Sequence, residues 1–275
     1  MENSRTIDYN AEYNNRARVP ENPAIMAGWA RDAAAYRATH PPVSISYGAG
    51  ERERIDLFDA GQASVIVMFI HGGYWQALDG SSFSHLARGL NAHGISVAVP
   101  TYDLCPQVLV AKILDQMRAA AMTLHGIAGQ RIITSGHSAG GHLAACLLAT
   151  DWKRIDPELP GNLVPAAYSL SGLFDLRPLV STYLNQALNL DQAEAERLSP
   201  LFWDPPATGK LHAAVGALES GEYHRQSRTI VEAWGTKGVE TSFESLAGEN
   251  HFTIVAPLAD SNSAAVRHIA RLAAS

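Results

Sequence analysis

Gly136-His137-Ser138-Ala139-Gly140 is the stretch that decides the fold of this 275-residue chain. This Gly-x-Ser-x-Gly match directly follows the apolar run 131–134 and precedes the helix-forming run 143–148. A serine at a sharp strand-to-helix turn presents its hydroxyl above the end of the strand. The flanking glycines suit such a turn, because a side chain there would collide with neighbouring backbone. The alternative interpretation is a Gly/Ser turn with no chemical role.

A second glycine-rich stretch, His71-Gly72-Gly73-Tyr74-Trp75, follows the apolar run 65–70. Alone it would be only a turn, but it lies one strand and about 65 residues before the serine turn. Such a loop aims backbone N–H groups at an oxyanion in acyl-transfer chemistry. We expect the N–H groups of Gly72, Gly73 and Ala139 to form this anion site, helped by the N-terminus of the helix after the serine.

A reactive serine requires a base, and His251 has the best position among the 11 histidines. It follows the last predicted strand, in the chain order serine, acid, histidine. Most other histidines lie in helical stretches and are expected at the surface or in packing. We assign His71 to holding the glycine loop and His137 to lining the pocket.

The acid is expected after the strand 211–216, where Glu219 stands at the tip of the loop. Glu222 is the first alternative, but it begins the following helix, where an acidic residue suits the helix dipole without any catalytic role. Asp175, after the preceding strand, is the second alternative.

Strand-length apolar runs alternate with helical stretches along the chain, which favours a mostly parallel eight-stranded sheet with helices on both faces. The first two runs alternate with polar residues and predict an antiparallel edge hairpin. The predicted strands are residues 43–47, 54–58, 65–70, 95–100, 131–136, 166–170, 211–216 and 241–246. The predicted helices are residues 82–93, 108–127, 142–150, 222–235 and 263–274.

Residues 173–210 depart from this alternation and predict a cap insertion of short helices over one end of the sheet. We find no repeat and no linker, so residues 1–275 are expected to form a single α/β domain. Six aromatic residues occur in segments expected near the carboxyl edge, and they either shape an aryl pocket or pack the cap. These residues are Tyr74, Trp75, Phe174, Tyr183, Phe202 and Trp203.

The composition excludes several classes of protein. With 47% hydrophobic and 17% charged residues the chain forms a core, and a net charge of −6 argues against nucleic-acid or anionic-membrane partners. No apolar signal segment follows the polar N-terminus, and Cys105 and Cys146 belong to no Cys-x-x-Cys pair. We therefore expect a cytoplasmic protein with reduced thiols and no metal site.

The chain resembles the α/β-hydrolase superfamily, and within it the kynurenine formamidase (arylformamidase)-like group and related bacterial carboxylesterases. One departure is that the group more often has Asp at the position of Glu219. The segments that carry the resemblance are Tyr13-Asn14-Asn15-Arg16 with Val19-Pro20, His71-Gly72-Gly73-Tyr74-Trp75, Gly136-His137-Ser138-Ala139-Gly140, Ser171-Gly172-Leu173-Phe174-Asp175-Leu176 and Glu219-Ser220-Gly221-Glu222-Tyr223-His224-Arg225-Gln226-Ser227.

The resemblance implies a Ser-His-Glu hydrolase that cleaves a small amide or ester through an acyl-enzyme, with Ser138, His251 and Glu219 as the triad and no cofactor or metal. N-formyl aryl amides are the first expected substrates, short acyl esters are the alternative, and a non-catalytic binding protein on the same fold is a third hypothesis. The expected partner is a small-molecule substrate, and a homodimer stays open. The expected substrate pocket consists of Tyr74, Trp75, His137 and Phe174.

Overall fold

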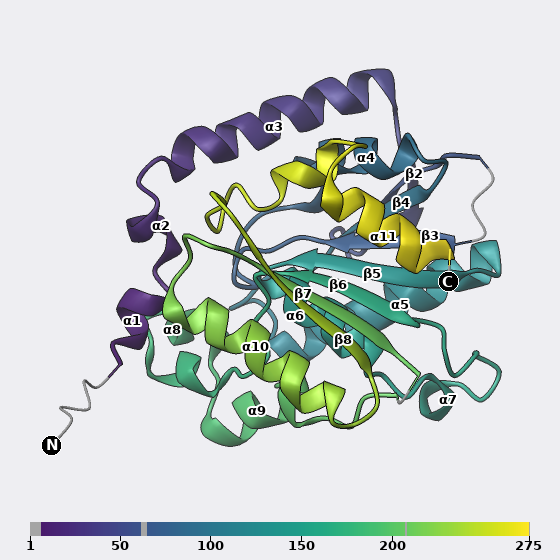
Figure 1. Ribbon diagram of the computed structural model, residues 1–275. Coiled ribbons are helices and arrows are strands. Elements are labelled where there is room, and N and C mark those ends of the chain that lie inside the picture. Colours follow the sequence, from purple (N-terminus) through teal and green to yellow (C-terminus); the bar gives the residue numbers. More distant parts are fainter. Residues whose placement is uncertain (1–6, 62–64, 207, 275) are drawn as a thin grey trace, which may run out of the picture.

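A computed structural model describes residues 7–61, 65–206 and 208–274 and contains one eight-stranded sheet with the order β1-β2-β4-β3-β5-β6-β7-β8 (Figure 1). Strands β1 and β2 pair antiparallel, β2 also pairs antiparallel with β4, and every other pairing is parallel. The predicted fold class and edge hairpin are therefore confirmed. The strands are β1 (Val43–Ser46), β2 (Arg54–Phe58), β3 (Val65–Ile70), β4 (Ser96–Thr101), β5 (Arg131–His137), β6 (Ala166–Leu170), β7 (Lys210–Gly216) and β8 (Glu240–Leu246).

The strand order reverses next to β3. From β3 the chain crosses to β4 on one side and then returns to β5 on the other, with Val65 opposite Arg131 and Ile70 opposite Gly136. Loops that leave neighbouring parallel strands at such a switch point diverge and leave a crevice at the carboxyl edge. The glycine loop after β3 and the serine turn after β5 therefore lie side by side.

Two apolar cores lie on opposite faces of the sheet. Alternate residues of β3 enter different cores, because successive side chains of a strand point to opposite faces. One core joins the sheet to α5 (Val110–Ala128), α6 (Ala139–Leu148) and α10 (Gly221–Gly235). The other joins it to α3 (Asn22–Thr39), α4 (Ala87–Asn91) and α11 (Ala264–Ala274). This two-sided burial explains why the central strands are almost continuously apolar.

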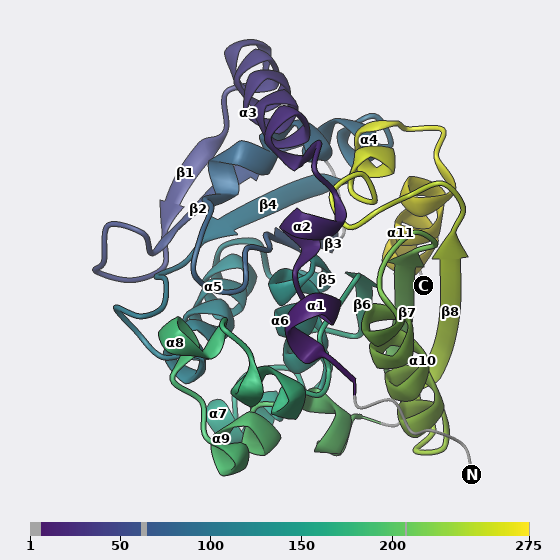
Figure 2. The same cartoon turned by 90° about the vertical axis from the view of Figure 1, so that its left-hand side faces the viewer.

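The segment between β6 and β7 forms short helices, as predicted for residues 173–210. Near the N-terminus, the short helices α1 (Tyr9–Glu12) and α2 (Asn15–Arg18) run along one end of the sheet, below α3 and beside α10 (Figures 1 and 2). The remaining helices are η1 (Gly80–Leu86), α7 (Trp152–Ile155), η2 (Arg177–Ser181), α8 (Asn185–Leu188), α9 (Gln192–Arg197), η3 (Pro200–Phe202) and η4 (Ala256–Ala259).

The sequence analysis missed α3, the 18-residue helix that precedes the sheet. The buried residues Asn22, Trp29, Ala33 and Tyr36 recur at helical spacing, but the exposed face is rich in alanine, so a periodicity argument finds little contrast between the two faces. Its rich alanine content and the proline near its first turn were the available signals. Within the described ranges, no helix is long and apolar enough to cross a membrane.

Candidate active site

Ser138 occupies the turn between β5 and α6 with φ 57° and ψ −117°, a backbone conformation that side-chain-bearing residues rarely adopt. Its N–H is fixed by the Leu170 carbonyl at 2.8 Å. A Cβ on Gly136 would lie 2.1 Å from the Gly140 carbonyl oxygen, and one on Gly140 would lie 1.9 Å from the Ile70 carbonyl oxygen. The requirement for both flanking glycines is thereby confirmed.

His251 lies against Glu219, with 2.6 Å between Nδ1 and Oε2. Because a carboxylate only accepts, Nδ1 carries the proton and Nε2 is left as the basic nitrogen. Glu219 also accepts from the Ser171 hydroxyl at 2.5 Å and from the Gly216 N–H at 2.7 Å. The ring of Tyr223 packs on His251 with 4.6 Å between ring centroids. The imidazole is thus fixed both in its plane and in its tautomer.

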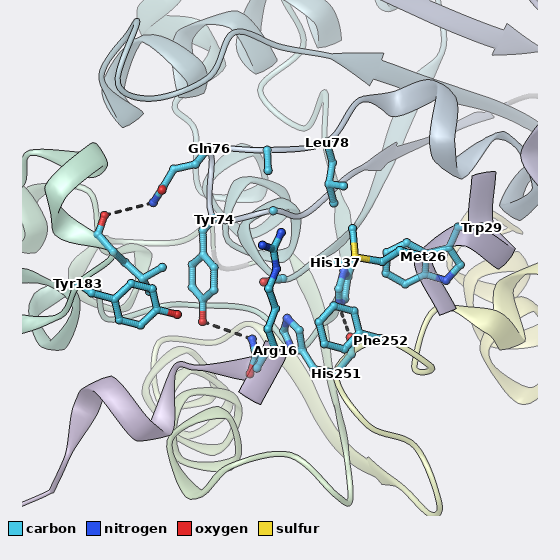
Figure 3. A pocket seen from close by; sticks show the side chains of 15 residues that line it. Arg16, Met26, Trp29, Tyr74, Gln76, Leu78, His137, Tyr183, His251 and Phe252 are labelled. Atoms are coloured by element: carbon cyan, nitrogen blue, oxygen red, sulfur yellow. Dashed lines mark hydrogen bonds between the residues drawn. The ribbon is translucent and has the colours of Figure 1, made fainter. Parts of the chain in front are cut away.

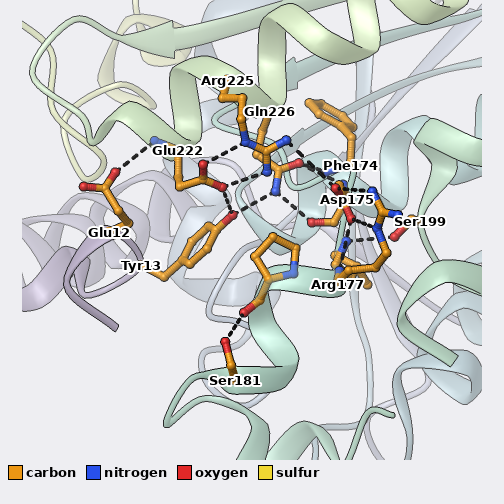
Figure 4. A network of polar contacts seen from close by, with 12 residues as sticks. Glu12, Tyr13, Phe174, Asp175, Arg177, Ser181, Ser199, Glu222, Arg225 and Gln226 are labelled. Carbon is orange, nitrogen blue, oxygen red and sulfur yellow. Dashed lines mark hydrogen bonds and ion pairs between the residues drawn. The ribbon is translucent and has the colours of Figure 1, made fainter. Parts of the chain in front are cut away.

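The two alternative acids have other partners, as Figure 4 shows. Glu222 accepts from the Tyr13 hydroxyl at 2.7 Å and pairs with Arg225 at 2.7 Å. Asp175 pairs with Arg177 at 2.9 Å. Among the described residues, neither carboxylate hydrogen-bonds to the histidine that Glu219 orients. Both therefore join α10 to the segment after β6 and to the N-terminal region, away from the serine turn.

His71 holds the glycine loop, as the sequence analysis expected. The His71 Nδ1–H donates to the Gly72 carbonyl at 2.8 Å, and the buried ring stacks on Tyr102 with 4.2 Å between ring centroids. Burial lowers the pKa of His71 to about 4, so it holds the loop as a neutral ring. A Cβ on Gly72 would lie 3.1 Å from the Cβ of Ser138, which places the loop directly beside the serine.

Three backbone N–H groups in this region have no acceptor in the described part of the chain. They belong to Gly72, Gly73 and Ala139. Unpaired N–H groups beside a serine at a helix N-terminus form a site for negative charge. The anion site expected from the sequence stays a prediction, with its three N–H groups beside the serine.

A chain of hydrogen bonds joins the N-terminal region to Tyr223, whose ring packs on His251. The Tyr74 hydroxyl donates its single proton to the Tyr13 carbonyl at 2.7 Å, so Tyr223 is the donor in the 2.7 Å contact between Tyr223 and Tyr74. The Tyr223 oxygen accepts from the Asn15 amide at 2.8 Å. The Tyr223 hydroxyl therefore has a fixed orientation.

Ser138 and His251 line one cavity of about 290 Å³, shown in Figure 3. Among the residues that the structure describes, no aspartate or glutamate lines it. One part of it is apolar, and its side chains are Met26, Trp29, Leu78 and Phe252. The other part carries polar groups from Arg16, Tyr74, Gln76 and Tyr183. The cavity therefore suits a small, partly aromatic molecule.

A family model described as "alpha/beta hydrolase fold" matches residues 67–255. The chain belongs to the α/β-hydrolase family. It is 31% identical to kynurenine formamidase of Danio rerio over 253 residues, which is 87% of this chain and 83% of the fish protein. It is 30% identical to kynurenine formamidase of Drosophila melanogaster, over 77% of this chain and 74% of the fly protein.

Solved structures place this hydrolase among esterase-type folds. A putative thioesterase from Silicibacter sp. TM1040 superposes with a TM-score of 0.88 at 33% identity, covering 96% of this chain and 100% of that one. An esterase of the bacterial hormone-sensitive lipase family has a TM-score of 0.68 at 21% identity, covering 92% and 97% respectively, and shows the shared fold alone.

Two pocket assignments for this hydrolase were wrong. Trp75 turns inward at φ 57° and packs edge-on against His142 with 5.1 Å between ring centroids, and the Phe174 ring fills the space above Gly172. Neither aromatic lines the cavity, and both are fully buried. Tyr74 and His137 do line it, as expected.

The sequence analysis missed the contribution of the N-terminal region to the hydrolase cavity. Arg16 comes from α2, and Met26 and Trp29 come from α3. Ser171, which holds Glu219, was also missed, although it stands directly after a predicted strand. That position at the carboxyl end of β6 was the available signal.

Proposed function

We propose that this hydrolase cleaves the formamide bond of small N-formyl aryl amines through an acyl-enzyme. Ser138 is the nucleophile, His251 the general base and Glu219 the acid that orients it. The single observation that carries the proposal is the 2.6 Å contact between Nδ1 of His251 and Oε2 of Glu219, beside a serine that lines the same cavity. The relatedness to two kynurenine formamidases supports the formamide as the substrate bond.

In the first half-reaction the Ser138 oxygen attacks the formyl carbon while Nε2 of His251 takes the hydroxyl proton. The carbonyl oxygen becomes an oxyanion and accepts from the N–H groups of Gly72, Gly73 and Ala139; each such donor lowers the barrier by about 3 kcal/mol. The C–N bond then breaks, His251 gives its proton to the leaving aryl amine, and the formyl group stays on the serine as an ester.

In the second half-reaction a water molecule attacks the formyl ester. His251 takes a proton from the water and returns it to the Ser138 oxygen as the ester bond breaks, which releases formic acid. Glu219 accepts three hydrogen bonds from groups of this chain, which hold its carboxyl group in place beside the imidazolium in both steps.

A carboxylesterase activity toward short acyl esters is the second candidate. An isoprenylcysteine α-carbonyl methylesterase of Arabidopsis thaliana is 26% identical over 76% of this chain and 56% of the plant protein. The same serine, base and anion site would serve an ester, because only the leaving atom differs.

A substrate panel separates the two candidates. We expect kcat/KM for N-formylkynurenine to equal or exceed that for p-nitrophenyl acetate and butyrate. A value several orders of magnitude below the best ester would reject the formamidase proposal and support the esterase.

A covalent label tests the nucleophile itself. A fluorophosphonate should label the parent and the Ser220→Ala variant but not Ser138→Ala, since Ser220 is a buried serine near the acid. An unlabelled parent would instead favour a non-catalytic protein on this fold. Both cysteines are buried free thiols, which supports a location in the cytoplasm, where thiols stay reduced.

A further inference from the structure

Arg16 is an unpaired cation at the cavity that holds Ser138 and His251. It stands on the short helix α2, and Figure 3 shows its guanidinium pointing into the cavity. Among the described residues, no hydrogen bond or ion pair involves this guanidinium. By contrast, Arg18, two residues further along the same helix, is paired: its guanidinium lies 3.9 Å from the Glu12 carboxylate.

Tyr183 adds a second free donor at the same part of the cavity. Its ring is 45% exposed, and within the described chain its hydroxyl has no hydrogen-bond partner. Burial raises the pKa of Tyr183, and the charge of Arg16 opposes that rise. Both residues line the same cavity, where Arg16 offers a guanidinium and Tyr183 a hydroxyl to a bound ligand.

The electrostatics of the cavity favour an anion at this position. No carboxylate lines the wall, and His137 is kept neutral because burial lowers its pKa. The net charge of −6 gives no long-range attraction for an anionic substrate, and salt screens charges beyond about 8 Å in any case. Recognition of an anion here must therefore be local, and Arg16 is the charged group available for it.

The polarity of the cavity wall also suits a ligand that carries an apolar aryl ring and an acidic side chain. Figure 3 shows Met26 and Trp29 on one side of the cavity and Tyr183 on the opposite side, with Arg16 between them. An aryl ring fits the apolar side, and an acidic side chain extends toward the cation.

We propose that Arg16, with the Tyr183 hydroxyl, binds a carboxylate carried on the leaving-group part of the substrate. The inference rests on the proposed function, since it names the class of aryl amide that the site takes. A guanidinium matches a carboxylate with two parallel hydrogen bonds.

The test uses pairs of substrates that differ only in charge. Formanilides with an ortho side chain ending in a carboxylate are compared with the carboxamides of the same length, and phenyl acetates with the same two side chains form a parallel ester series. The readout is the ratio of kcat/KM, carboxylate over carboxamide, within each series, at low and high salt. The variants are Arg16→Gln, Tyr183→Phe and the matched control Arg18→Gln.

We expect the parent and Arg18→Gln to prefer the carboxylate about tenfold, equivalent to ~1.4 kcal/mol. The preference should fall to near one in Arg16→Gln, mainly through KM. It should shrink with salt in the parent and in Arg18→Gln, which both keep Arg16. Tyr183→Phe should lose part of it.

A parent with no preference for the carboxylate, or an equal preference in Arg16→Gln, would overturn the inference. The ester series keeps this outcome separate from the proposed function. If no formanilide is hydrolysed, the formamidase proposal fails, while the charge ratio among the esters still decides the role of Arg16.

Discussion

A hydrogen bond of 2.5 Å joins the Ser171 hydroxyl to Oε1 of Glu219, so the loop after β6 fixes the carboxylate that extends from the loop after β7. Ser171 itself has a positive φ of 52°. Residues held in this region of φ persist only where the surrounding structure determines them, and they cluster at functional sites. The orientation of His251 therefore depends on a residue that is not among the described residues lining the cavity.

Ser171→Ala should lower kcat about tenfold, because a hydrogen bond to a charged group contributes about 1.5–3 kcal/mol and Glu219 becomes free to rotate. Ser220→Ala is the matched control, since the Ser220 hydroxyl is buried in a neighbouring loop without a hydrogen-bond partner among the described residues. Steady-state kinetics on one substrate checks both. Equal kcat values in the two variants would contradict a role for Ser171 in holding the acid.

Glu219→Gln should lower kcat/KM by roughly 10³-fold or more, because an amide can present the wrong hydrogen-bonding partner to Nδ1 of His251. Glu222→Gln and Asp175→Asn should retain most of the turnover and lose stability instead, since each breaks an ion pair of the network in Figure 4. Kinetics and urea unfolding on the three variants measure this. The reverse ranking in kcat/KM would transfer the acid role to Glu222 or Asp175.

Gly140→Ala should lower the free energy of unfolding by about 3 kcal/mol or more, because its Cβ would meet the rigid Ile70 backbone. Gly126→Ala is the opposite case. Gly126 is an exposed residue of α5 with nothing within 4 Å of its Cβ position, so alanine should raise the same quantity by up to ~1 kcal/mol. Urea denaturation compares them. A stable Gly140→Ala protein would show that the serine turn can relax.

Lowering the pH should reduce the free energy of unfolding of this hydrolase, and this loss should begin at pH values above those at which most carboxylates titrate. Burial lowers the pKa of His71, His85 and His142 to about 4, whereas the unfolded chain protonates near 6.5. The unfolded state therefore binds more protons between these values. The stability that these neutral rings contribute is present above pH 6.5 and is lost as the pH falls toward 4.

The measurement is the free energy of unfolding at several pH values between 4.5 and 7. The slope of the free energy of unfolding against pH should decrease by up to ~1.4 kcal/mol per pH unit when one buried histidine is removed, as in His142→Gln. His40→Gln, at an exposed position, should leave the slope unchanged. Identical slopes in the parent and His142→Gln would show that His142 is not kept neutral by the fold.

Much of the fold followed from local sequence. Apolar runs such as 65–70 predicted the central strands, because a strand covered on both faces must be apolar at every position. Helix α3 was not predicted from the sequence, because it lacks such a continuous pattern. It buries few side chains, and most of its alanines are exposed, so its buried face differs little from its exposed face.

The sequence by itself determined the serine turn and the glycine loop, because tight backbone geometry admits few residue types, and short motifs record that restriction. Only the tertiary structure decided which carboxylate reaches His251, which aromatic side chains turn into the core, and that Arg16 enters the cavity. These relationships join positions far apart in the chain. They depend on how strands and helices pack in three dimensions, and no local pattern encodes that packing.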